Sequence, residues 1–219
     1  AGFAVDMEEI SKIATTRGIA LIEDAAHAPG SEWFGKSLGT LGDVGCFSFF
    51  SNKNITCAEG GLLVTNRDDI AERARLLRSH GMTSLSFERA KGHATKYDVV
   101  DLGYNYRLDD IRGALILEQL KKLASDQRRR TELRRKYIEE LSGIGEITIP
   151  YQHYSQKSSN YIMPIVLNRG NAEAREIIRN KLASKGIQTS VHYPAVHRFS
   201  IYEAFRRSLP ITEMVADLE

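Results

Sequence analysis

The stretch Gly18-Ile19-Ala20-Leu21-Ile22-Glu23-Asp24 decides the fold class of this chain. Its four apolar residues follow a glycine and end at two carboxylates. A fully apolar strand that ends in polar residues is typical of an α/β sheet that is covered on both faces. Ligands of such sheets bind beyond the carboxyl ends of the strands, so Asp24 is a candidate site residue.

The residues before this strand predict a helix. Apolar Ile10, Ile13 and Ala14 recur at helical spacing, and Gly18 ends the pattern. Asp6 is a suitable N-cap, and a glutamate three residues later fits a capping box. Helix and strand together extend the α/β pattern to the start of the chain.

The remaining pattern changes character near residue 143. Before it we predict strands at 44–50 and 62–65, a helix at 68–78, a loop at 81–97 and a long helix at 108–141. After it, short strands at 146–149, 161–167 and 188–191 alternate with a helix at 172–185. We therefore predict a large α/β domain over residues 1–140 and a small α+β domain over residues 141–219.

Composition excludes several classes of protein. The chain has 219 residues, of which 42% are hydrophobic and 26% charged, which argues against disorder. It contains no run of about 20 apolar residues, so we expect no membrane span. A net charge of +2 does not indicate a nucleic-acid-binding protein. Cys46 and Cys57 form no CxxC motif, and a reducing cytoplasm suits them.

The two ends of the chain suggest that a longer protein surrounds it. The sequence opens at Ala1 without an initiator methionine and runs almost directly into a helix. It stops inside another helix-like stretch at 212–219. We expect the chain to be a fragment whose small C-terminal domain is also cut.

Three segments carry a family resemblance: LIEDAAHA at 21–28, FSFFSNKN at 47–54 and GYNYR at 103–107. With EGG at 59–61 and VHYP at 191–194, they resemble the DegT/DnrJ family of sugar aminotransferases, which depend on pyridoxal 5'-phosphate (PLP). The resemblance covers residues 1 to about 205. It implies a three-layer α/β/α PLP-transferase domain, present here without its N-terminal part, followed by a small α+β domain.

The resemblance also assigns roles to five residues. Lys53 corresponds to the lysine that forms a Schiff base with the cofactor, and Asp24 to the carboxylate on the pyridine nitrogen. His27 corresponds to the contact of the ring's phenolic oxygen, and Ser48 to a phosphate-binding serine. Asn105 corresponds to an asparagine that reaches the phosphate of the neighbouring subunit, which implies a homodimer with shared active sites.

The residues themselves are consistent with this chemistry. An imine-forming enzyme needs a lysine amine and a carboxylate that keeps the pyridine ring protonated. Lys53 directly follows a predicted buried strand, which is an unusual place for a lysine that only needs solvent. Taken alone, a loop lysine is usually a surface charge and a strand-end aspartate usually a cap, so the combination of segments carries the assignment.

Two further features have competing interpretations. By resemblance, His192 lies near the sugar-binding mouth and is a candidate substrate contact, although it could equally be a polar turn residue. His192 and His197 do not suit a metal site, because Pro194 breaks any helix between them, so we expect no metal. The basic run at 127–136 continues an apolar stripe, which indicates a solvated helix face and not an RNA-binding surface.

The resemblance implies a transaminase that moves an amino group, expected from glutamate, to a keto-sugar nucleotide. A PLP-dependent sugar dehydratase of the same fold is the alternative within enzymes, although many of these replace the lysine with histidine. A non-catalytic binding protein is the third possibility. The sugar, its nucleotide and the aminated carbon stay open, and loops such as 84–96 would influence that choice.

Overall fold

The computed structural model describes residues 1–83 and 96–218, so most of the predicted loop at 81–97, including the stretch expected to influence substrate choice, lies outside the described residues. The chain forms two compact units. The first comprises Ala1–Leu133 with Tyr154–Ile162, and the second comprises Arg134–His153 with Met163–Glu219. The predicted boundary at residue 140 stays a prediction.

The first helix, α1 (Met7–Arg17), confirms the predicted start and end signals. The Asp6 side chain accepts hydrogen bonds from the backbone nitrogens of Glu8 and Glu9, as an N-cap does. Gly18 ends the helix in the left-handed conformation with φ of 60°, which a residue without a Cβ adopts at little cost. The chain then turns into the sheet.

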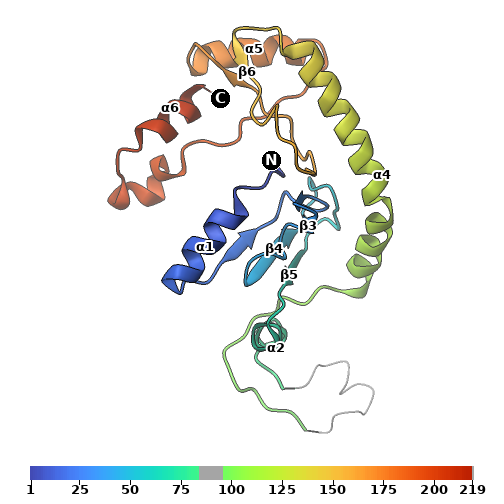
Figure 1. Cartoon of the computed structure of the whole chain (residues 1–219). Helices are drawn as coiled ribbons and strands as arrows, with labels where there is room; N and C mark the ends of the chain where they lie inside the picture. The colour runs from blue at the N-terminus through green and yellow to red at the C-terminus, as the bar shows by residue number, and fades with distance from the viewer. Residues whose placement is uncertain (84–95, 219) are drawn as a thin grey trace. The chain divides into compact units, whose positions relative to one another are not determined.

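The main sheet has three strands in the order β1-β4-β5 (Figure 1). These are β1 (Ile22–Asp24), β4 (Val44–Ser48) and β5 (Gly61–Val64). Strand β1 runs parallel to β4, with Asp24 opposite Cys46, and β5 runs antiparallel to β4. The result is a mixed α/β structure with small sheets, and the complete three-layer domain stays a prediction.

The prediction of a first strand covered on both faces is wrong for this chain. Ile19 is 58% exposed and Ile22 is 66% exposed. An apolar run makes burial favourable, but burial also needs a packing element on each side of the sheet. The part of the chain that the structure describes does not supply that cover here.

The half-buried Glu23 carboxylate organises the glycine-rich loop between β3 (Lys36–Ser37) and β4. Strand β3 pairs with β2 (Glu32–Trp33). The Glu23 side chain accepts hydrogen bonds from the backbone nitrogens of Gly39, Leu41 and Gly42, at 2.7, 2.6 and 2.7 Å. A Cβ on the glycine at position 45 would lie 1.9 Å from the oxygen of Gly39. The loop is therefore held directly against β4.

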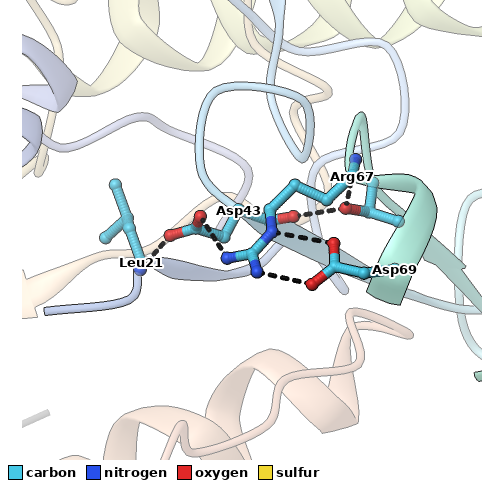
Figure 2. A network of polar contacts seen from close by, with 5 residues as sticks. Leu21, Asp43, Arg67 and Asp69 are labelled. Atoms are coloured by element: carbon cyan, nitrogen blue, oxygen red, sulfur yellow. Dashed lines mark hydrogen bonds and ion pairs between the residues drawn. The ribbon is translucent and has the colours of Figure 1, made fainter. Parts of the chain in front are cut away.

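A second polar network connects the strands to α2 (Asp68–Leu77), as Figure 2 shows. Asp43 Oδ2 accepts from the backbone nitrogen of Leu21 at 2.8 Å, which joins β1 to β4 at their starts. Arg67 reaches Asp43 Oδ1 at 3.4 Å and both carboxylate oxygens of Asp69 at 3.1 and 2.7 Å. These hydrogen bonds lower the pKa of Asp43, the bond from the Leu21 nitrogen most and the bond from Arg67 next.

Helix α4 (Asp110–Leu141) confirms the long predicted helix and packs on the second of two core clusters. These clusters are Met7, Ala25, Ala28 and Leu38, and Phe49, Ile55, Cys57 and Ile116. Buried Gln127 donates to the backbone oxygens of Gly30 and Ser158, at 2.7 and 3.0 Å. In residues 1–83 and 96–218, no helix has the length and apolar character to cross a membrane.

The second unit is a small α+β assembly. It contains β6 (Ile147–Thr148) antiparallel to β7 (Val166–Leu167), α5 (Ala172–Ser184), the 3₁₀ helices Val196–Arg198 and Ser200–Phe205, and α6 (Pro210–Leu218). Asn171 caps α5, and the chain turns at Gly186 with φ of 76°. The helix predicted at 172–185 is thereby confirmed.

Two strand predictions were wrong in part or whole. Residues 188–191 form no strand, and only 166–167 of the predicted strand at 161–167 pairs. The Thr189 oxygen accepts from the Arg179 side chain at 3.4 Å, and the Tyr161 oxygen accepts from Arg130 at 3.4 Å. At both places an arginine of a helix satisfies the backbone where a neighbouring strand was expected.

Candidate active site

The candidate site lies at the carboxyl edge of β1 and β4. The two strands are parallel, so Asp24, the last residue of β1, and Ser48, the last residue of β4, come out at the same edge. Lys53 follows five residues after Ser48, in a turn that its backbone nitrogen closes on the Phe50 oxygen at 3.0 Å. Sheet topology thus explains why residues 29 positions apart contribute to one place.

Lys53 and Asp24 are close enough to influence each other electrostatically. Partial burial lowers the pKa of the Lys53 amine, and the Asp24 carboxylate acts in the opposite direction. Asp24 Oδ1 also accepts a hydrogen bond from the backbone nitrogen of Ala26 at 3.1 Å, which orients the carboxylate. The pair combines a lysine with an enlarged neutral fraction and a carboxylate in a defined direction.

His27 and Lys53 contact the same aromatic ring. The ring centroids of His27 and Tyr161 are 4.1 Å apart with planes inclined by 34°. The Lys53 Nζ lies 4.9 Å from the centroid of the Tyr161 ring. The His27 Nδ1 is also 3.2 Å from the amino nitrogen of Ala1. The structure therefore brings Asp24, His27 and Lys53 together.

Ser48 is the last residue of β4 and precedes the lysine turn. Its side chain is half-buried, and its Oγ accepts from the backbone nitrogen of Phe50 at 3.3 Å. The hydroxyl hydrogen stays available for an acceptor, because this bond uses only a lone pair of the oxygen. Ser48 can thus offer a donor to an anionic group at this edge.

Asn105 stands in a different environment. It forms an isolated antiparallel bridge with Ser79, and the backbones of its neighbours Tyr104 and Tyr106 bond to the residues around that bridge. The two tyrosine rings stack at 4.9 Å with an inclination of 12°. Backbone bonds thus fix the position of Asn105, while its side chain is exposed.

His192 belongs to the second compact unit, so its place is described within that unit. Its ring lies 4.5 Å from the ring of Tyr193. Its Nδ1 is buried and has no hydrogen-bond partner among residues 1–83 and 96–218. His197, in contrast, pairs with Glu213 at 2.9 Å and lowers the pKa of that carboxyl to about 2, with the Leu209 backbone nitrogen contributing.

The donor set of the β1–β4 edge suits pyridoxal phosphate. The cofactor needs an amine for its aldehyde carbon, a carboxylate for its ring nitrogen and donors for its phosphate. Lys53, Asp24 and Ser48 supply these three groups, and His27 adds an imidazole beside them. The lowered pKa of the Lys53 amine is a second fitting property, since only the neutral amine is a nucleophile.

Comparison with known proteins identifies the family. A model of the DegT/DnrJ/EryC1/StrS aminotransferase family matches residues 1–217. The chain belongs to this family. The DegT/DnrJ resemblance expected from the three sequence segments is thereby confirmed.

Two curated relatives match most of this chain and about half of their own length. UDP-4-amino-4,6-dideoxy-N-acetyl-beta-L-altrosamine transaminase of Campylobacter jejuni is 38% identical over 203 residues, 92% of this chain and 52% of that protein. Protein MJ1066 of Methanocaldococcus jannaschii is 35% identical over 204 residues, 92% of this chain and 53% of that protein. The chain spans about half the length of the curated relatives it matches.

Solved structures of family members show the same fold. Helicobacter pylori PseC, an aminotransferase involved in the biosynthesis of pseudoaminic acid, is 30% identical, with a TM-score of 0.90 over 99% of this chain and 57% of that one. The PLP form of the sugar aminotransferase Spr1654 of Streptococcus pneumoniae is 24% identical, with a TM-score of 0.87 over 99% of this chain and 59% of that one. The aminotransferase fold is thus shared over the length of this chain.

Several residues that hold the Lys53 and His27 segments in place were not predicted from the sequence. Tyr161 was expected inside a strand, and no role was predicted for Ser159 or for Asn54. Ser159 Oγ donates to the His27 oxygen at 2.5 Å, and Asn54 Nδ2 donates to the Ser159 oxygen at 3.1 Å. These contacts span 132 and 105 residues, and no local spacing can indicate them.

Proposed function

We propose that the complete protein containing this chain is a PLP-dependent aminotransferase that moves an amino group from glutamate to a keto-sugar nucleotide. The observation that carries this proposal is the placement of Lys53 and Asp24 at one edge of two parallel strands, near enough to couple electrostatically. That pairing of amine and carboxylate is what the cofactor requires. Membership of the family supports the same reaction class.

Lys53 would act first as the attachment point and then as a proton carrier. When bound, the cofactor supplies an aldehyde carbon that can carry the amino group and a ring that withdraws electrons from it. Once free of that carbon, the Lys53 Nζ would take a proton from the carbon next to the donor nitrogen and deliver it to the cofactor carbon within the same half-reaction, and it would move a proton in the opposite direction when the keto-sugar is aminated. Partial burial favours the neutral amine that this role needs.

Asp24 and His27 would hold the ring. The Asp24 carboxylate would accept a hydrogen bond from the protonated ring nitrogen and keep the proton there, because a neighbouring negative charge favours the cationic form. Its bond from the Ala26 nitrogen directs the carboxylate before any ligand arrives. The His27 imidazole would contact the ring oxygen.

Ser48 and Asn105 would bind the phosphate from two subunits. The Ser48 hydroxyl lies at the edge that Asp24 and Lys53 share. The exposed Asn105 side chain would reach the phosphate of a neighbouring copy, which makes each site a property of a homodimer. This division explains why backbone bonds position Asn105 although its side chain is exposed.

The substrate class rests on two observations. The transaminase of Campylobacter jejuni, which is named for a UDP-linked amino sugar, is 38% identical to this chain. In the second unit, the buried Nδ1 of His192 has no partner within the described residues, and a sugar hydroxyl could supply one. We propose that His192 contacts the sugar substrate.

Borohydride reduction followed by mass spectrometry tests the proposal on the complete protein with added PLP. We expect a visible absorption band, and reduction should leave the cofactor covalently on the peptide that contains Lys53. Lys53→Ala should abolish the modification, whereas Lys36→Ala, which removes an exposed lysine of β3, should not. A complete protein that stays colourless with PLP would contradict the proposal and favour a binding protein.

A panel of keto-sugar nucleotides with glutamate then tests the reaction. Transamination replaces the keto oxygen with an amine and consumes glutamate, and both changes are visible by mass spectrometry. Loss of water from the sugar, with glutamate unchanged, would instead identify a dehydratase of the same fold.

A further inference from the structure

The return segment (residues 154–162) is held to the first unit by buried serines. Ser158 and Ser159 are buried, and Ser158 Oγ donates to the Gly2 oxygen at 2.9 Å. The Ser159 backbone nitrogen donates to Ser31 Oγ at 2.8 Å, and Ser159 Oγ donates to the His27 oxygen at 2.5 Å. The segment is therefore fixed directly to the backbone of a proposed cofactor residue.

The same segment also holds the loop that carries Lys53. Asn54, the residue after the lysine, donates through Nδ2 to the Ser159 oxygen at 3.1 Å. The Asn54 Oδ1 is buried and accepts no hydrogen bond from the described part of the chain. The bond to Ser159 is thus the side-chain attachment that the structure shows for this residue, and it fixes the lysine loop to the return segment.

Residues of helix α4 also form hydrogen bonds to the return segment. Arg130 Nη1 approaches the backbone oxygens of Asn160 and Tyr161, at 3.5 and 3.4 Å. Asn160 Nδ2 donates to Thr131 Oγ1 at 3.0 Å. The Tyr161 backbone is therefore held between α4 and the buried serines, and its ring occupies a defined place.

We propose that Tyr161 is a positioning residue of the site, whose ring holds the Lys53 amine in place and orients the His27 imidazole. The ring lies 4.9 Å from the Lys53 Nζ and 4.1 Å from the centre of the His27 ring. A cation within about 6 Å of an aromatic centroid is attracted by the ring quadrupole. This inference rests on the proposed function, because that function is what makes Lys53 and His27 important. The contacts of Tyr161 with both residues do not depend on the proposed function.

The attraction between the Tyr161 ring and the Lys53 ammonium group changes the pKa of Lys53 in one direction. A ring that binds the ammonium form favours protonation of Lys53 and so raises its pKa, as the Asp24 carboxylate also does. Burial acts against both. The His27 imidazole, which contacts the same ring, is a further titratable group at this ring. Removing the ring alone should therefore lower the pKa of Lys53.

Competitive acetylation of the cofactor-free complete protein measures that pKa directly. The protein is labelled with acetic anhydride over a range of pH values, and the peptide that contains Lys53 is quantified by mass spectrometry. We expect Tyr161→Leu to lower the pKa of Lys53 by about 0.5, the shift that an exposed cation–π pair supports. Tyr161→Phe, which keeps the ring, should leave the pKa unchanged.

A second measurement follows cofactor binding. Titration with PLP, read by absorbance, should show weaker binding for Tyr161→Leu than for Tyr161→Phe, because the amine and the imidazole are no longer held. Tyr154→Leu is the matched control, since it removes a ring of the same segment that packs on Phe3 and accepts from the Ala4 nitrogen. Tyr161→Met replaces Tyr161→Leu if the leucine variant does not fold by circular dichroism.

The two proposals fail in different ways. If Tyr161→Leu folds and binds PLP with the wild-type Lys53 pKa and affinity, the role of Tyr161 is refuted while the aminotransferase proposal stands. If the wild-type protein does not bind PLP, the proposed function is refuted. A difference between leucine and phenylalanine in the pKa of Lys53 would still support the contact in that case.

Discussion

Lys53 and Asn105 lie in the same compact unit but in opposite surroundings. Burial, the Asp24 carboxylate and the Tyr161 ring all act on Lys53 from within this chain. Asn105 is exposed and lies close in sequence to Leu102, which is 92% exposed, and Ile111, which is 84% exposed. Both side chains are large and apolar, so this stretch receives little cover from the part of the chain that the structure describes.

The two halves of the proposed site are therefore positioned by different parts of the structure. The groups around Lys53 are positioned by strand topology and by bonds to the return segment. The backbone around Asn105 is equally fixed, by bonds from Tyr104 and Tyr106 to the end of α2, but its side chain has its proposed ligand elsewhere.

Replacing the ring-nitrogen partner should have the largest effect. In the complete protein, Asp24→Asn removes the charge that would keep the cofactor ring protonated, and the amide cannot compensate. We expect the transamination rate to fall by about 10²–10⁴-fold, the contribution of a positioned acid–base group. Steady-state kinetics with glutamate measure the loss. A rate within a few-fold of wild type would contradict the proposed role of Asp24.

Subunit mixing tests whether Asn105 acts in the site of the neighbouring subunit, as we propose. Asn105→Ala alone should weaken PLP binding by roughly 10- to 100-fold, because one hydrogen bond to a charged phosphate is lost. Co-expression of Lys53→Ala with Asn105→Ala subunits should restore one tight site per mixed dimer. The intact site combines the lysine of one subunit with the asparagine of the other. Mixed dimers without any tight site would show that Asn105 acts within its own chain.

The loop that supports β1 and β4 should respond to loss of its carboxylate. Glu23→Ala leaves three backbone nitrogens of the 39–42 loop without their acceptor. We expect a loss of about 2–3 kcal/mol in the free energy of unfolding, from denaturant titration. Glu118→Ala, which removes an exposed carboxylate paired with Lys121, is the control and should change little. Equal effects of the two variants would contradict this reading of Glu23.

A pH-dependent contribution should come from Glu213 in the second unit, and it is the smallest effect. The pKa of this carboxyl is lowered from 4.5 to about 2, chiefly by the hydrogen bond from His197. A depressed folded pKa stabilises the fold above the unfolded value and loses that contribution as pH falls. The difference in thermal midpoint between wild type and Glu213→Gln should therefore be full above pH 4.5 and shrink towards pH 2. A difference that grew on acidification would refute the assignment.

Helix caps and apolar spacing, which are local signals of the sequence, predicted where the helices begin and end. Asp6 and Gly18 marked both ends of α1, and the apolar spacing of 108–141 predicted α4 nearly to the residue. Asp24 and Lys53 could be selected from the sequence only because they lie in motifs that occur together and in order along the chain. The motifs, in their order along the chain, also indicated the family.

Tertiary structure alone decided what surrounds those residues. The proximity of Asp24 to Lys53 depends on β1 and β4 being parallel neighbours, and Tyr161 reaches Lys53 through a segment that is distant in sequence. The failed strand at 188–191 and the exposed Ile22 have the same origin, because a strand and a buried face both need partners from elsewhere in the chain. Helix caps and spacing act over a few residues, whereas sheet pairing, burial and side-chain contacts arise only when distant segments meet.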